Sequence, residues 1–155
     1  MYLLKYGVTF VKKGYLTLGI SMKSEKAEII CIVDDDEVYQ FSVTRTIKAA
    51  NIVKKILIFS DGEEVFEFLQ DNISKKEELP DIIFLDINMP YMDGWEFLDY
   101  YTKIKPNLPK KITVYLVSSS VSEKDQVKAQ AISDVSDYIV KPITIEDFRT
   151  AIEKY

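Results

Sequence analysis

The sequence predicts an α/β domain in which five parallel strands, in the order 2-1-3-4-5, form one sheet flanked by five helices. Two observations lead to this prediction. Short runs that are apolar at every position alternate along the chain with segments whose apolar residues recur at helical spacing. The alternation is strict, and such a pattern places helices on both faces of a parallel sheet through right-handed crossovers. A chain of 155 residues is long enough for one such domain.

The predicted strands are apolar throughout, as strands buried on both faces are. They cover Ile29–Val33, Ile56–Phe59, Ile82–Leu85, Ile112–Val117 and Tyr138–Val140. At this chain length the flavodoxin-like sheet, with its order 2-1-3-4-5, is the natural choice among doubly wound folds.

Five helices are predicted between and after these strands from apolar residues three and four positions apart. The residues that indicate them are Tyr39, Val43, Ile47 and Ala50; Val65, Phe66, Phe68, Leu69 and Ile73; Phe97, Leu98, Tyr101 and Ile104; Val127, Ala131 and Ile132; and Phe148, Ala151 and Ile152. Ser60-x-x-Glu63 and Thr144-x-x-Asp147 read as capping boxes, and we expect Ser122 or a neighbour to cap the fourth helix.

The N-terminal segment differs in composition from the rest of the chain. Residues 1–26 hold five lysines and one glutamate, whereas the remaining 129 residues hold 15 basic and 24 acidic residues. We therefore predict an N-terminal extension at 1–26 and a domain at 27–155. Within the extension, Val8–Val11 and Tyr15–Leu18 predict a β-hairpin with a three-residue turn. It is either an extension without function or a hairpin that adds to a neighbouring sheet edge and mediates dimerisation.

Composition excludes several classes of function. The formal charge of −5 disfavours direct binding to nucleic acid. The chain has no histidine, which excludes a Ser–His–Asp triad, a histidine-ligated zinc site and a phosphohistidine on this chain. Its one cysteine excludes an internal disulfide. No apolar run approaches the ~20 residues of a membrane helix, and no signal peptide is recognisable, so we expect a cytoplasmic protein that does not bind a membrane.

Polar side chains follow four of the predicted strands directly. The sequence continues with Asp34-Asp35-Asp36 after the first strand, Asp86 after the third, Ser118-Ser119-Ser120 after the fourth and Lys141-Pro142 after the fifth. Ligands of such sheets bind outside the carboxyl ends of the strands. Because the first and third strands are neighbours in the predicted order, we expect Asp34, Asp35 and Asp86 to lie close together.

Three adjacent carboxylates repel one another, and a divalent cation relieves the repulsion. Clustered oxygen ligands suit Mg²⁺, which keeps several waters and also binds phosphate oxygens. The charges of three carboxylates, Lys141 and Mg²⁺ sum to zero. An arriving phosphoryl group would then meet the metal, the Lys141 ammonium and the Ser118 hydroxyl, and a carboxylate could attack it in line to form an acyl phosphate.

Residues 28–155 resemble a response-regulator receiver domain of two-component signalling, of the single-domain, chemotaxis-receiver-like kind. The resemblance rests on motif pieces that occur in order at the strand ends: Val33-Asp34-Asp35-Asp36, the run from Asp86 to Gly94 with Met89-Pro90, Ser118-Ser119 and Lys141-Pro142. The small Gly-Ala pair usual before the last strand is replaced by Asp134-Val135, so the preceding turn is expected to differ.

The resemblance implies a role for each of these residues. Asp86 matches the phosphoacceptor. Asp35 and Asp86 match direct Mg²⁺ ligands, with the backbone carbonyl of Asn88 as a third and Asp34 acting nearby or through water. Ser118 matches the switch hydroxyl and Lys141 the lysine that pairs with the phosphoryl group, before a cis Lys141-Pro142 bond. Tyr138 matches the aromatic residue that changes rotamer in the switch. Asn88 and Ser120 match two positions that tune the rate of dephosphorylation.

By the same resemblance the chain is not an enzyme in its own right and catalyses only its own phosphorylation and dephosphorylation. The expected phosphoryl donor is a sensor histidine kinase or a histidine phosphotransfer protein. Independently of the resemblance, we expect residues of the first helix such as Val38 and Phe41 to face this partner. A downstream protein target then binds the surface formed by the fourth helix, the fifth strand and the fifth helix.

Three other interpretations are less consistent with the residues. A haloacid-dehalogenase-type phosphatase needs a second aspartate two residues after its nucleophile, where this chain has Asn88. A flavodoxin-type carrier needs a phosphate loop after the first strand, where three aspartates would repel a phosphate. A receiver that serves only as a scaffold would not need the four residues that remain intact: Asp35, Asp86, Ser118 and Lys141.

Overall fold

The computed structural model describes residues 8–12, 15–19 and 26–155, and its main body is a five-stranded parallel sheet. The strand order is β4-β3-β5-β6-β7, with parallel pairing throughout. In chain order these strands are the first to fifth of the sheet, so the predicted order 2-1-3-4-5 is confirmed. Their bounds are β3 (Ile29–Val33), β4 (Lys55–Phe59), β5 (Ile82–Asp86), β6 (Thr113–Ser118) and β7 (Val135–Val140).

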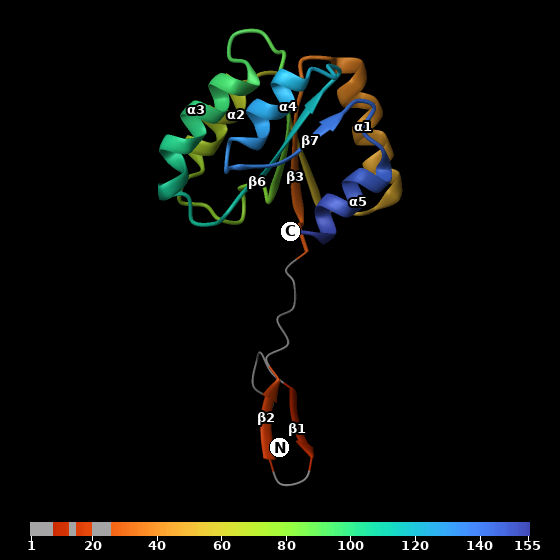
Figure 1. Cartoon of the computed structure of the whole chain (residues 1–155), viewed down its shortest axis with the longest axis vertical. Coiled ribbons are helices and arrows are strands. Elements are labelled where there is room, and N and C mark those ends of the chain that lie inside the picture. Colours follow the sequence, from red (N-terminus) through yellow and green to blue (C-terminus); the bar gives the residue numbers. More distant parts are fainter. Residues whose placement is uncertain (1–7, 13–14, 20–25) are drawn as a thin grey trace.

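Helices cover both faces of this sheet (Figure 1). They are α1 (Glu37–Ala50), α2 (Gly62–Asp71), α3 (Gly94–Ile104), α4 (Glu123–Gln130) and α5 (Ile145–Glu153), and a 3₁₀ turn, Lys105–Asn107, follows α3. Helices α1 and α5 lie on one face, and α2, α3 and α4 lie on the other.

Alternate residues of the central strands face two separate cores. Cys31, Ile83 and Leu85 point to the core under α2 and α3, together with buried residues of those helices such as Leu69 and Phe97. Ile30, Ile32, Ile82 and Phe84 point to the core under α1 and α5, which includes Ile47 and Phe148. Both faces of the strands are therefore buried, and this explains why the strand sequences are apolar without alternation.

Two predicted helix starts are confirmed, and one is wrong by a residue. Thr144 and Asp147 form the predicted capping box of α5, and Ser122 caps α4 by accepting from the N–H of Asp125. Helix α2 is capped by Asp61, not by Ser60. The Asp61 carboxylate accepts from the N–H of Glu64, and the Glu64 side chain accepts from the N–H of Ser60, so the helix begins one position later than the Ser60-x-x-Glu63 pattern predicts.

The predicted N-terminal hairpin is present as a separate two-stranded antiparallel sheet of β1 (Val8–Lys12) and β2 (Tyr15–Gly19). The predicted three-residue turn is wrong, because Lys12 pairs with Tyr15 and so belongs to the strand. Residues 13–14, 1–7 and 20–25 lie outside the described residues. The division into an extension at 1–26 and a domain at 27–155 stays a prediction.

Strand β7 begins three residues before the predicted Tyr138. It is an edge strand in which Ser136 and Asp137 are exposed, so polar residues are tolerated there and hide the strand in the sequence. The residue before it, Asp134, accepts hydrogen bonds from Thr102 and Lys105 and so ties the turn to the end of α3. No helix among the described residues is long and apolar enough to cross a membrane.

A largely buried ion pair between Asp81 and Lys110 lies at the edge of the sheet where the strands begin. The Asp81 carboxylate accepts from the backbone N–H groups of Glu28 and Ile29, each at 2.8 Å, and from Lys110 Nζ at 2.7 Å. Burial by itself raises the pKa of Asp81, but these hydrogen bonds outweigh burial and hold the pKa below its usual range. Asp81 thus joins the start of β3 to the segments before β5 and β6.

We expect Asp81→Asn to lower the free energy of unfolding by about 2 kcal/mol at neutral pH, because Lys110 loses its buried partner. The pKa of Asp81 is lowered on folding, so its contribution is complete above the unfolded value of about 3.9 and is lost as the pH falls through the lower folded value. In urea titrations from pH 7 to pH 3, the difference from wild type should therefore shrink below about pH 4. A pH-independent difference would contradict the assignment; Asp99→Asn, at an exposed position of α3, is the control.

Candidate functional site

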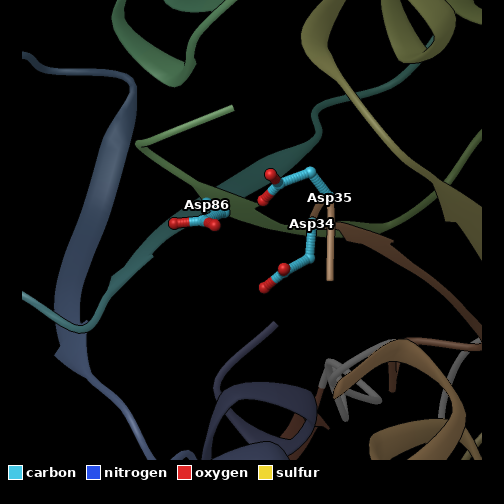
Figure 2. A group of neighbouring side chains, drawn as sticks. All are labelled: Asp34, Asp35 and Asp86. Atoms are coloured by element: carbon cyan, nitrogen blue, oxygen red, sulfur yellow. The ribbon is translucent and has the colours of Figure 1, made fainter. Parts of the chain in front are cut away.

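Three aspartates meet at the edge of the sheet where the strands end, as the sequence predicts (Figure 2). Asp34 and Asp35 follow β3, and Asp86 is the last residue of β5, the strand paired with β3. Each offers a carboxylate oxygen, and these oxygens all lie within 4.8 Å of one another. Asp34 and Asp86 are buried and Asp35 is exposed. The cluster is therefore open to a ligand on the Asp35 side.

Local backbone contacts fix the position of the two aspartates after β3. The Asp34 carboxylate accepts from the N–H of Asp36, and the side-chain amide of Gln40 donates to the Asp34 carbonyl at 2.5 Å. The Asp36 carboxylate caps α1 by accepting from the N–H groups of Val38 and Tyr39. Of the three consecutive aspartates, two therefore face the site and the third starts the helix.

Asp86 is held by close packing of α3 against the end of β5. A Cβ atom at Gly94 would lie 2.6 Å from the Asp86 carbonyl oxygen and 3.0 Å from Ile87 Cα, so only glycine permits this approach. The Gly94 N–H donates to the Ile87 carbonyl at 2.9 Å. The Asn88 N–H donates to the Asp86 carboxylate, which places Asn88 beside the acidic cluster, with an exposed side chain.

Lys141 supplies the positive charge of the site. Its Nζ lies 2.5 Å from Asp34 Oδ2 and 3.5 Å from Asp86 Oδ2, and it lies 4.4 Å from the centre of the Tyr39 ring. The Lys141 N–H donates to the Ser118 carbonyl at 2.8 Å, which aligns the loop after β7 with the end of β6. The Lys141-Pro142 peptide is cis, as expected.

The pKa shifts of Asp86 and Lys141 reflect burial together with the nearby negative charge. Burial, followed by the charge of Asp34, raises the pKa of Asp86 above its ordinary value despite the opposing effect of Lys141. Burial by itself lowers the pKa of Lys141, but Asp34 and Asp86 outweigh it and raise that pKa. In the part of the chain that the structure describes, the ion pairs of the three clustered carboxylates all go to Lys141, and they involve only Asp34 and Asp86. A hard divalent cation that prefers oxygen ligands fits both the charge and the donor set.

The hydroxyl and aromatic residues form a second group beside the charged one. Ser118 is fully buried at the end of β6, one position beyond the Val117 that pairs with Asp86, and its Oγ accepts from the N–H of Ser120. Tyr138 on β7 is half-buried, and its hydroxyl donates to the Ser120 carbonyl at 2.9 Å. The side chains of Ser118 and Tyr138 thus both bond to the backbone of Ser120, and the Ser120 hydroxyl accepts from the N–H of Ser122 at the cap of α4.

Two residues of the site were not predicted from the sequence as site residues. The sequence pattern places Tyr39 on the apolar face of the first helix and predicts no role for Gln40. Only their position in the sequence could have indicated a role at the site, because both residues lie in the first turn of the helix that directly follows the aspartates. Burial, together with Asp34 and Asp86, raises the pKa of Tyr39, so its phenol stays neutral.

Comparison with known proteins identifies the family. Residues 30–153 match the response regulator receiver domain, and the chain belongs to this family of two-component signalling modules. Among curated relatives, the probable methanogenesis regulatory protein FilR2 of Methanothrix harundinacea is 24% identical over 139 residues, covering 90% of this chain and 88% of FilR2. The response regulator Rcp1 of Synechocystis is 29% identical over 129 residues, covering 83% of this chain and 86% of Rcp1.

Solved structures agree with this assignment. A two-component response regulator from Cytophaga hutchinsonii matches with a TM-score of 0.76 and 31% identity, covering 84% of this chain and 97% of that one. The Mn²⁺-bound form of Rcp1 matches with a TM-score of 0.61 and 28% identity, covering 82% of this chain and 90% of Rcp1. The predicted family and flavodoxin-like fold are thus confirmed.

We expect Asp35→Ala to weaken Mg²⁺ binding by roughly tenfold or more, because it removes one of the clustered charges while leaving the buried residues in place. Isothermal titration calorimetry with MgCl₂ measures the affinity, and urea titration confirms that the variant is folded. Asp99→Ala, at an exposed position of α3, should bind like wild type. Equal affinities of the Asp35 variant and wild type would remove Asp35 from the cation site.

Proposed function

We propose that this protein is a phosphorylation-controlled signalling module in which Asp86 accepts a phosphoryl group from a phosphohistidine of another protein, with Mg²⁺ as cofactor. One observation carries the proposal. The buried Asp86 carboxylate lies among two further carboxylates, with the Lys141 ammonium 3.5 Å from its Oδ2. These are the parts that phosphoryl transfer to a carboxylate requires: a nucleophile, a cation for the phosphoryl oxygens and ligands for a metal.

In the proposed reaction, an Asp86 oxygen attacks the phosphorus in line with the bond to the donor nitrogen. The new O–P bond forms as the N–P bond breaks, and the donor leaves as neutral imidazole when its other nitrogen carries a proton. Bound Mg²⁺ would neutralise charge on the phosphoryl oxygens. We assign its ligands as Asp35, Asp86 and the Asn88 carbonyl, with Asp34 nearby or bonded through water. Lys141 would leave Asp34 for a phosphoryl oxygen.

The proposed switch uses the second group of residues. Ser118 would turn its hydroxyl toward the phosphoryl group and give up the hydrogen bond from Ser120, and Tyr138 would reorient in response. The surface formed by α4, β7 and α5 would then change its preference for a downstream protein, as a population shift between two states. Helix α4 is suited to this because Ala129 is its one buried residue. Asn88 and Ser120 would tune the rate of dephosphorylation.

The chain contains no histidine, so the proposed phosphoryl donor must be another molecule: a sensor histidine kinase or a histidine phosphotransfer protein. We propose that it docks on α1 beside the acidic cluster. Val38 and Phe41 are 78% and 69% exposed there, and Ile58 of the edge strand β4 is 41% exposed. Phe41 and Ile58 line a groove of about 470 Å³ whose rim carries Arg45 and Lys48.

Acetyl phosphate with MgCl₂ should add one phosphoryl group to the protein, and Asp86→Ala should abolish the addition because no other residue is the acceptor. Intact-mass spectrometry under mild conditions measures the modification, and omission of Mg²⁺ should suppress it. Asp99→Ala is the matched aspartate control and should be modified like wild type. Absence of modification would favour a receiver that acts only as a scaffold, whereas modification that survives in Asp86→Ala would show that Asp86 is not the acceptor.

Phe41→Ser should slow phosphorylation by a phosphohistidine protein by about tenfold, because an exposed aromatic at the centre of an interface contributes strongly to binding. The rate with acetyl phosphate, which needs no docking, should be unchanged. Val127→Ser removes a comparably exposed apolar side chain from α4, 65% exposed, and serves as control. Equal slowing with both donors would show that Phe41 acts on the site and not on docking.

A further inference from the structure

Lys141 has a third partner besides the two aspartates, and that partner carries no charge. Its ammonium lies 4.4 Å from the centre of the Tyr39 ring, within the range of a cation–π contact. Tyr39 lies in the first turn of α1 and is half-buried against the core between α1 and α5. Packing against this core and the capped start of α1 therefore hold the Tyr39 ring in place.

We propose that Tyr39 is a positioning residue for the Lys141 ammonium, holding it at the site while its carboxylate partners change. The proposal rests on the proposed function, since it concerns the lysine that would bind the phosphoryl group. It assigns Tyr39 a part in phosphoryl binding that neither the sequence pattern nor the aspartate cluster indicates.

The contact distances support this role. The ammonium is 2.5 Å from Asp34 Oδ2 but 3.5 Å from Asp86 Oδ2, so it rests on Asp34. To contact a phosphoryl group on Asp86, it must loosen its contact with Asp34. Both carboxylates also belong to the cluster that would share a metal ion. The Tyr39 ring takes no part in that exchange, so it can keep contact with the ammonium throughout.

The aromatic ring carries the contact, and the hydroxyl does not. Within residues 26–155 the Tyr39 hydroxyl makes no hydrogen bond, whereas the Tyr39 N–H donates to the Asp36 carboxylate at 3.0 Å and fixes the backbone. The same cap begins the helix from which Gln40 reaches the Asp34 carbonyl. Phenylalanine should therefore replace Tyr39 with little loss, while leucine keeps apolar volume but removes the ring face.

The test measures binding of beryllofluoride, a phosphoryl mimic, to the full chain with saturating MgCl₂ by isothermal titration calorimetry. We expect Tyr39→Leu to weaken binding roughly tenfold and Tyr39→Phe to stay within about threefold, as the strength of a partly buried cation–π contact implies. Tyr100→Leu is the matched control: its ring lies 4.8 Å from Lys103 Nζ in a similar contact on α3, and its loss should leave binding unchanged.

A double-mutant cycle separates positioning of Lys141 from general support of the site. In a Lys141→Met background, where no ammonium remains, Tyr39→Leu should cause no further loss. Phosphorylation rates with acetyl phosphate supply the same cycle if the Met variant binds beryllofluoride too weakly for calorimetry. Mg²⁺ affinity without beryllofluoride should be the same in Tyr39→Leu and wild type. Urea titration checks folding, and Tyr39→Met replaces the leucine variant if that variant does not fold.

Three results would overturn the inference: wild-type binding by Tyr39→Leu, an equal loss in Tyr39→Phe, or a loss that persists in the Lys141→Met background. Failure of the proposed function is distinguishable from these, because it would appear as absence of beryllofluoride binding by the wild-type protein.

Discussion

The organisation of this protein depends on negative charge confined at one edge of a parallel sheet. Asp34, Asp35 and Asp86 are brought together by strand pairing between β3 and β5, and the ammonium of Lys141 contacts two of them, Asp34 and Asp86. In the proposed function, this excess of negative charge attracts a divalent cation and, through it, a phosphoryl group. The elements around the site serve to hold these charges in place: Asp36 starts α1 beside them, and Gly94 lets α3 press against the end of β5.

The pKa values of buried aspartates shift in opposite directions at the two edges of the sheet. At the edge where strands begin, Asp81 receives two backbone hydrogen bonds and a lysine, and its pKa is lowered. At the edge where strands end, burial and then the charge of Asp34 raise the pKa of Asp86. Removal of one partner from the pair at Asp81 would leave an uncompensated buried charge, whereas a perturbed pKa such as that of Asp86 is typical of functional sites. The contrast is consistent with the proposed function, which places the chemistry at the edge where the strands end.

The relatives of this chain in two-component signalling share its fold and extend over most of its length. Two different surfaces lie beside the acidic cluster. On one side, exposed apolar residues of α1 border a small groove; on the other, α4 is polar and attached through one buried residue. In the proposed function, the phosphoryl donor binds the α1 surface and the downstream protein binds the surface that includes α4. Phosphorylation of the site between them would link the two binding events.

The sequence determined the fold class, because uniformly apolar strands and helical spacing depend on local residue order. It also determined the members of the charged cluster, since the carboxyl ends of parallel strands lie at one edge of a sheet whatever the details of packing. The start of β7 could not be predicted from local patterns, because an edge strand tolerates polar residues such as Ser136 and Asp137. The N-cap of α2 could not be predicted either, because Asp61 and Ser60 are both competent hydrogen-bond acceptors. Only the tertiary structure decided that Lys141 rests on Asp34 and that Tyr39 lies against the same ammonium. Those contacts join residues about a hundred positions apart through side-chain conformations that no spacing along the chain records.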